Sequence, residues 1–141
     1  MSIETALYDR LTGTAAITAL VGSGSSARIY PDLAPASTEK PYCTYRTVST
    51  VRSRHFAGIA GSQVDFARVQ VDVWAATALS RRSVADAIRD ALDGFSGSMG
   101  DESLDVRRIA VDGPSMLTEP PFGDDEVPTY RATLDLEISH R

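Results

Sequence analysis

The chain has 141 residues, of which 43% are hydrophobic and 23% are charged. This composition is typical of one globular domain with its own core, and it excludes an intrinsically disordered chain. The formal net charge of -5 argues against a protein whose main role is to grip nucleic-acid phosphates, because that role requires a basic surface.

Cys43 is the single cysteine, so an intrachain disulfide and a cysteine-based zinc site are excluded, as is usual in a reducing compartment. The first residues, MSIETALYDRL, lack the basic and apolar regions of a signal peptide. No apolar run approaches the roughly 18 to 20 residues that span a bilayer. We therefore expect one soluble domain over residues 1–141, with no membrane partner.

Two helical segments, or one kinked helix, are predicted at the start of the chain. In the first segment the apolar residues recur at helical spacing, with Ser2 placed to cap the start and Gly13 near the end. These apolar residues are Ile3, Ala6, Leu7 and Leu11. The second segment covers residues 15–21 and stops at the turn GSGSS. A brief extended element, RIYPDLAP, follows and ends at its prolines.

Two long strands come next, separated by a glycine-bearing loop. Residues 41–53 are rich in Tyr, Thr and Val, and residues 66–77 alternate cleanly. In the second strand one face carries Ala67, Val69, Val71 and Val73, and the other carries Arg68, Gln70, Asp72 and Trp74. The loop between the strands, residues 52–63, is either a long hairpin loop or a mobile arm.

The second half of the chain predicts a helix and two more strands. The helix begins near Ser80, ends at Gly94 and carries an apolar stripe. The stripe consists of Val84, Ala87, Ile88, Ala91, Leu92 and Phe95. Residues 104–117 form a weaker strand whose apolar parity switches between Val106 and Ile109, which indicates a bulge. Residues 118–128 form a loop with three prolines and four acidic residues, and residues 129–141 form a terminal strand.

This order predicts an α+β fold, with a mainly antiparallel sheet of about four to five strands and two principal helices packed on one face. We expect Val69, Val71 and Val73 to face the helix stripe. Arg68, Gln70, Asp72 and Trp74 are then expected to face outward, toward a neighbouring subunit or a loop.

The sequence shows no recognisable set of catalytic or metal-binding residues. His55 and His140 lack metal-ligand spacing and are predicted to lie on the surface. Cys43 stands in mid-strand, where a small buried side chain is the preferred interpretation. The segment GSGSS lacks the lysine of a phosphate-binding loop.

The acidic cluster of the 118–128 loop suggests Ca²⁺, but its spacing differs from a calcium-binding loop, so a solvated loop is preferred. The cluster consists of Glu119, Asp124, Asp125 and Glu126. We therefore predict no catalytic, metal or cofactor site, and no cofactor.

Several residues point to protein partners instead. Arg46, Arg52, Arg54 and Arg68 form a basic patch if the two long strands pair, and arginine is enriched at protein interfaces. Trp74 either contacts a partner or packs under a loop or helix of its own chain. Arg81 and Arg82 occupy the first turn of the predicted helix, where the helix dipole disfavours cations. Either an anionic neighbouring subunit or solvent offsets that cost.

The ordered segments resemble the tail completion, or tail terminator, proteins of long-tailed (siphovirus-like) bacteriophages and gene transfer agents. The resemblance covers nearly the whole chain and rests on the order of six segments. They are LYDRLTGTAAITALVG, RIYPDLAP, KPYCTYRTVST, RVQVDVWAAT, VADAIRDALDG and YRATLDLEISH. The segment GDDEVPT has no counterpart that we recognise.

The resemblance implies a structural virion protein rather than an enzyme. Such a protein forms a homohexameric ring on the last ring of major tail-tube subunits, stops tube polymerisation and joins the tail to a head-tail connector or stopper. It lies at the neck end of the virion tail and is assembled in the bacterial cytoplasm. DNA passes through the bore without specific binding, and negative charge lining the bore would repel its phosphates. The alternatives are a head-closure or adaptor protein of the neck and, from another class, a small metal-dependent hydrolase.

Candidate contact residues follow from these considerations. The candidate bore-lining loop contains Asp124, Asp125 and Glu126, and residues 52–63 are the candidate arm that grips the tail tube. The candidate interface with another subunit or with the tail tube comprises Arg52, Arg54, His55, Phe56, Arg68, Gln70, Trp74, Arg81 and Arg82.

Overall fold

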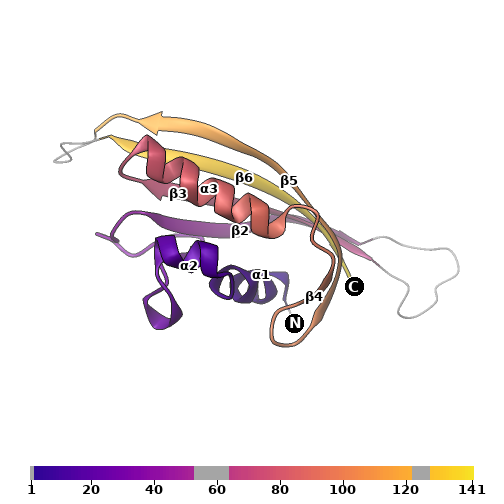
Figure 1. The fold of residues 1–141 in the computed structure, drawn as a ribbon. Helices are drawn as coiled ribbons and strands as arrows, with labels where there is room; N and C mark the ends of the chain where they lie inside the picture. The colour runs from indigo at the N-terminus through magenta and orange to yellow at the C-terminus, as the bar shows by residue number, and fades with distance from the viewer. Residues whose placement is uncertain (1, 53–63, 122–127) are drawn as a thin grey trace, which may run out of the picture.

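A computed structural model describes residues 2–52, 64–121 and 128–141, and its chain path is shown in Figure 1. The helices are α1 (Ile3–Thr12), α2 (Ala15–Val21) and α3 (Ala78–Leu92), with a 3₁₀ turn, η1 (Gly24–Ser26). The strands are β1 (Ile29–Pro31), β2 (Tyr42–Arg52), β3 (Asp65–Ala75), β4 (Gly97–Met99), β5 (Leu104–Glu119) and β6 (Thr129–His140).

The strands form one sheet in the order β1-β2-β3-β6-β5-β4. β1 runs parallel to β2, and all other neighbours are antiparallel. The predicted α+β class is confirmed. The prediction of a mainly antiparallel sheet of about four to five strands is wrong in its strand count, because the described sheet has six strands, and the sheet is mixed because β1 pairs with β2 in parallel. β4 was missed because it has only three residues, which is too short for an alternating pattern to be recognised.

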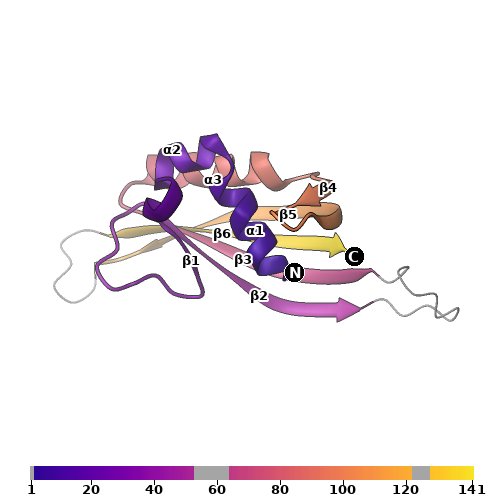
Figure 2. The same cartoon turned by 90° about the horizontal axis from the view of Figure 1, so that it is seen from below.

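All three α-helices lie on one side of the sheet, and the opposite side carries none of the described helices (Figure 2). Local signals explain where the helices begin. The Ser2 side chain accepts a hydrogen bond from the Thr5 amide, and the Thr77 side chain accepts one from the Ser80 amide. Both are N-caps that satisfy amides without a partner inside the helix. The Thr77 cap places the start of α3 two residues before the predicted Ser80.

The core lies between the helices and the sheet. Val69, Val71 and Val73 of β3 are fully buried, as are Val84 and Ile88 of α3. The expectation that these valines face the helix stripe is confirmed. Burying one such side chain contributes about 1.5 to 3 kcal/mol. The stripe of α3 and the alternation of β3 thus specify how the two elements pack.

β5 is irregular, as the switch of apolar parity predicted. Its pairing with β6 shifts register between Val106 and Arg108, and again between Asp112 and Ser115. The second shift contains Gly113, whose φ of 108° is strongly disfavoured for side-chain-bearing residues. An added Cβ there would lie 2.9 Å from the Thr133 carbonyl oxygen. Glycine therefore permits the close approach of β5 to β6.

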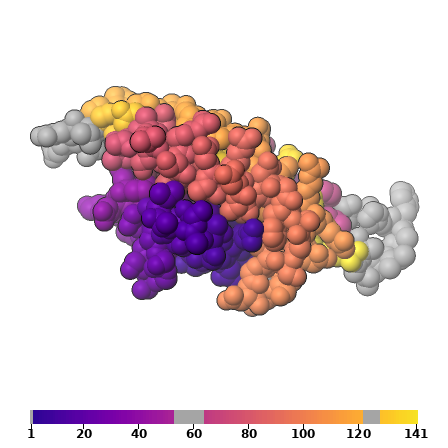
Figure 3. All heavy atoms as spheres, viewed as in Figure 1, coloured from indigo at the N-terminus to yellow at the C-terminus, as the bar shows by residue number. Residues whose placement is uncertain are grey.

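Within the described ranges, no helix has both the length and the apolar character that crossing a bilayer requires. The helix-covered side forms a continuous surface over the sheet, as the space-filling view in Figure 3 shows. The opposite side of the sheet is left open by the described helices (Figure 2).

Candidate functional site

The side of the sheet opposite the helices, called the outer face here, carries mainly polar and aromatic side chains. Strand alternation places them there, because the residues before and after each buried residue along a strand point to the opposite face of the sheet. The register aligns three rows across β2, β3 and β6. These rows are Tyr42, Trp74 and Arg131; Thr44, Asp72 and Thr133; and Arg46, Gln70 and Asp135.

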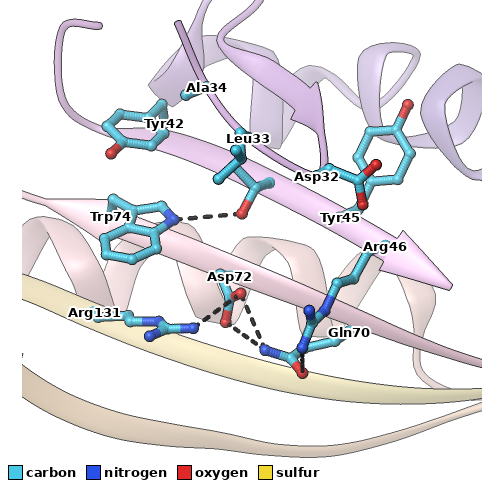
Figure 4. Close-up of a pocket in the computed structure, with 11 residues that line it drawn as sticks. Asp32, Leu33, Ala34, Tyr42, Tyr45, Arg46, Gln70, Asp72, Trp74 and Arg131 are labelled. Carbon is cyan, nitrogen blue, oxygen red and sulfur yellow. Dashed lines mark hydrogen bonds and ion pairs between the residues drawn. The ribbon is translucent and has the colours of Figure 1, made fainter. Parts of the chain in front are cut away.

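Trp74 is held between two neighbours in the first row (Figure 4). Its ring stacks on Tyr42, with centroids 6.0 Å apart and an interplanar angle of 18°. On the other side the Arg131 guanidinium lies 4.6 Å from the Trp74 ring centroid. The indole Nε1 donates a hydrogen bond to the Thr44 hydroxyl at 3.4 Å. The ring is therefore presented in one fixed orientation, which lowers the entropic cost of using it for binding.

Asp72 is the centre of the polar network beside this row. It is only 8% exposed, and its carboxylate accepts hydrogen bonds from Thr133 at 2.8 Å and from Gln70. Arg131 completes the network with an ion pair at 3.1 Å. A buried carboxylate needs such partners because desolvation penalises an unpaired charge. Burial of Asp72 was not predicted, because its partners come from strand register and not from sequence spacing.

A groove of about 320 Å³ lies above this network. The segment that follows β1 forms one wall with Asp32, Leu33 and Ala34, and the outer face forms the floor (Figure 4). Leu33 is 84% exposed at the rim. The groove thus combines a large exposed apolar residue with an aromatic floor, a combination that suits protein contacts better than catalysis.

Exposed apolar side chains also gather at both ends of the sheet. At the end where β2 meets β3, Val51 pairs directly with Phe66, and they are 62% and 49% exposed. At the other end, Leu117 is 51% exposed and Leu79 at the start of α3 is 79% exposed. Exposed apolar clusters of this kind mark interaction surfaces in many proteins.

The structure brings some of the predicted interface residues onto the outer face. Arg68, Gln70 and Trp74 lie there, as expected. Arg68 approaches Asp135 at 4.0 Å. Arg52 lies on the other side of the sheet, where its guanidinium contacts Asp65 at 2.9 Å.

The remaining predicted arginines also have partners within the chain. Arg81 donates to the Leu117 carbonyl at 3.0 Å and lies over the Tyr130 ring. Arg82 pairs with Asp86 one turn along α3. Other predicted positions lie outside the described residues: Arg54, His55, Phe56, Asp124, Asp125 and Glu126, with most of the candidate arm.

The basic patch is consequently more neutral than predicted. The two long strands do pair, but Arg52 and Arg68 each lie beside an aspartate of the same chain. The hydrogen bond with Arg52 lowers the pKa of Asp65 below its ordinary range, and the same contact raises the pKa of Arg52. The sequence shows which residues are charged, but which of them pair depends on the strand register, which the sequence alone does not reveal.

The prediction that His140 lies on the surface is wrong. β6 continues to His140, which is 8% exposed and lies in register between Asp65 and Val106. Neither ring nitrogen has a hydrogen-bond partner among the described residues. The histidine was misassigned because it lies one residue from the C-terminus, where a frayed end was expected.

Two further observations concern reactivity. Cys43 is buried, as predicted, and burial raises the pKa of its thiol to about 12. A thiol of this kind is a poor nucleophile at neutral pH. In the described part of the chain, no group of three or more histidine, cysteine or carboxylate side chains is arranged to hold a metal ion.

Comparison with known proteins identifies a matching family and similar solved structures. The family model described as Tail completion protein gp17 matches residues 5–140, which agrees with the resemblance seen in the sequence. A search of curated protein sequences finds no significant match.

Among solved structures, this chain is similar to a chain of the "Virion of native gene transfer agent (GTA) particle". The TM-score is 0.63 at 14% sequence identity, and the match covers 98% of this chain and 95% of that chain. At this identity the similarity shows a shared fold. Because the family model spans nearly the whole sequence, this chain belongs to the tail completion protein gp17 family.

Proposed function

We propose that this protein is a structural component of a bacteriophage or gene transfer agent tail that forms a homohexameric ring on the end of the tail tube. The ring ends tube polymerisation and joins the tail to a head-tail connector or stopper, while DNA passes through the bore. The observation that carries the proposal is the family match over residues 5–140. The shared fold with a chain of a gene transfer agent virion supports it.

The surface of the chain supports a role in assembly. Trp74 is fixed on the outer face, and exposed apolar residues lie at both ends of the sheet. A ring requires two different surfaces on one subunit, because each copy contacts its neighbours through unlike patches. A domain with one helix-covered side and one open side offers two such unlike surfaces.

The candidate contacts predicted from sequence are part of this proposal. Arg68, Gln70 and Trp74 share the outer face, so we assign them to one contact with the tail tube or with a neighbouring subunit. The other candidate interface residues, the candidate bore-lining loop and the candidate tail-tube arm keep the roles that were predicted for them from the sequence.

The decisive experiment mixes the purified protein with its tail-tube protein and follows mass in solution and negative-stain images. Rings capping tubes of limited length are the expected result. Arg68→Glu is expected to weaken capping, and Arg89→Glu, a charge change at an exposed site on α3, is expected to leave it unchanged. A protein that binds the connector and ignores tube ends would instead be a head-closure or adaptor protein.

A further inference from the structure

Two stretches of strand edge lack a strand partner in the described part of the chain. The first is the outer edge of β2. β1 pairs only with Cys43–Tyr45, and the Asp32 amide donates to the Tyr45 carbonyl. From Arg46 to Arg52, β2 pairs only with β3. Exposed backbone amides and carbonyls on such an edge are a template for another strand.

The second stretch lies near the end of β5. β4 pairs with Leu104–Val106, and the loop after α3 bonds the backbone of Ile109. From Ser115 to Glu119 the described sheet pairs β5 only with β6. The Leu117 carbonyl already accepts a hydrogen bond from Arg81, so a strand that binds this edge would have to use its other backbone amides and carbonyls.

The two edges have matching properties. Val48 and Val51 on β2 are 50% and 62% exposed, and Met116 and Leu117 on β5 are 37% and 51% exposed. Joining the edges would remove these apolar side chains from water. Soluble proteins usually protect long edges of this kind, so an unprotected apolar edge indicates a partner.

Charge distinguishes one edge from the other. The β2 edge begins at Arg46 and ends at Arg52, and the β5 segment has Asp112 before it and Glu119 at its end. An alignment of Ser49 beside Ser115 places two residues of the outer face together, because Ser49 pairs with Arg68 and Ser115 pairs with Thr133. It also brings Arg46 within one residue of Glu119. Opposite charges across strands are favourable, whereas like charges repel.

Strand direction is also compatible. Successive antiparallel pairings across β2, β3, β6 and β5 make β5 run opposite to β2. A cyclic arrangement keeps this relation between β5 of one copy and β2 of the next. The free stretches of β2 and β5 lie at opposite ends of the sheet (Figure 1). When they join, each copy of the chain is therefore shifted relative to the next along the strand direction. The strands of closed sheets also show a stagger of this kind.

We propose that the Arg46–Arg52 edge of β2 binds the Ser115–Glu119 edge of β5 from a second copy of this chain, as an antiparallel, head-to-tail contact. The inference rests on the proposed ring for its cyclic closure. The contact is short, because Pro114 has no amide hydrogen and ends the ladder on the β5 side. Apolar contact and the opposite charges of Arg46 and Glu119, which share the outer face, supplement the backbone hydrogen bonds.

Single-cysteine replacements test this contact directly. Ser49→Cys and Ser115→Cys are near-isosteric changes at exposed positions, and the native Cys43 is only 1% exposed. The two variant proteins are mixed under oxidising conditions, with and without tail tubes. We expect a disulfide-linked dimer in the mixture and in neither variant alone, and a ladder of oligomers from the double variant. Ser83→Cys, exposed on α3, replaces Ser115→Cys in the matched control and should give no product.

The outcomes separate this contact from the proposed function. Dimers of Ser49→Cys alone would mean a symmetric contact and would overturn the proposal, as would no product from the mixture with and without tubes. A benzophenone label on the Ser49→Cys variant should capture another copy of the chain, and capture of the tail-tube protein would reassign the edge. Tube capping is scored in the same samples. Capping without the disulfide refutes the edge contact alone, and the disulfide without capping refutes the terminator function alone.

Discussion

Arg131 on β6 forms an ion pair with Asp72 on β3 at 3.1 Å, although the register places Arg131 opposite Trp74 and Asp72 opposite Thr133. The contact is therefore diagonal. It lets one guanidinium neutralise a buried carboxylate while lying over the indole ring. The same side chain thus connects the stability of the outer face with the orientation of its most prominent aromatic residue.

Asp72→Ala is expected to lower the free energy of unfolding by about 2 to 3 kcal/mol, because it removes several charge-assisted hydrogen bonds and leaves Arg131 with one fewer anionic partner. Urea unfolding measures the change. Asp135→Ala is the matched control, since its pair with Arg68 is longer, at 4.0 Å, and more exposed. The control should cost less than about 1 kcal/mol. Equal losses in the two variants would show that the Asp72 network does not act as a buried unit.

Packing of α3 against the sheet predicts a contrast between two residues of the same helix. Ile88 is fully buried and Leu79 is 79% exposed. Ile88→Ala should destabilise the fold by about 2 to 5 kcal/mol, because it leaves a cavity in the core. Leu79→Ala should change stability by less than about 0.5 kcal/mol. Thermal unfolding of both variants checks the position of the helix. A large loss for Leu79→Ala in the isolated protein would contradict it.

Glu4 predicts a pH-dependent contribution to stability. Thr47 donates a hydrogen bond to its carboxylate at 2.6 Å, and this bond is the main reason that the pKa of Glu4 lies below its ordinary value of 4.5. Because folding lowers this pKa, the stabilisation is fully present above about pH 4.5 and is lost as the pH falls through the folded value.

Thr47→Val should therefore destabilise the protein at neutral pH, and its difference from wild type should shrink as the pH falls below about 4.5. Urea unfolding as a function of pH measures this. Thr50→Val, at an exposed position of the same strand, should show no such trend. A difference for Thr47→Val that stays constant down to acid pH would exclude the linkage.

The Cys43 thiol should be inert in the native protein. Burial raises its pKa to about 12, so the reactive thiolate is scarce and also shielded. A thiol reagent at neutral pH should modify the native protein at least about 100-fold more slowly than the protein in urea. The exposed thiol of Ser49→Cys is the positive control. Rapid reaction of native Cys43 would mean that the edge formed by β1 and β2 opens readily.

The spacing of apolar residues along the chain was the most reliable structural signal in the sequence. The stripe from Val84 to Leu92 and the alternation from Ala67 to Val73 correctly predicted α3, β3 and the way they face each other. The parity switch after Val106 correctly predicted a bulge. These features follow from side-chain periodicity along one segment, which requires no knowledge of neighbours.

Short and cross-strand features were less accessible. β4 has three residues, too few to establish a period, and β1 was recognised only as a brief extended element. The candidate site was predicted in part: Arg68, Gln70 and Trp74 were assigned to the outer face, but Tyr42, Thr44 and Arg131 were missed. These residues are distant in sequence and become neighbours only when β2, β3 and β6 align.

The sequence by itself determined the class of the fold, its buried faces and its family resemblance, because these depend on local pattern and on the order of segments. Tertiary structure decided which charges are neutralised, how Trp74 is held, and that His140 is buried. Each of these depends on register, since a shift of one residue in a strand reverses every side chain to the other face. The free edges of β2 and β5 likewise emerge only from the complete sheet, because an edge is defined by the absence of a neighbouring strand.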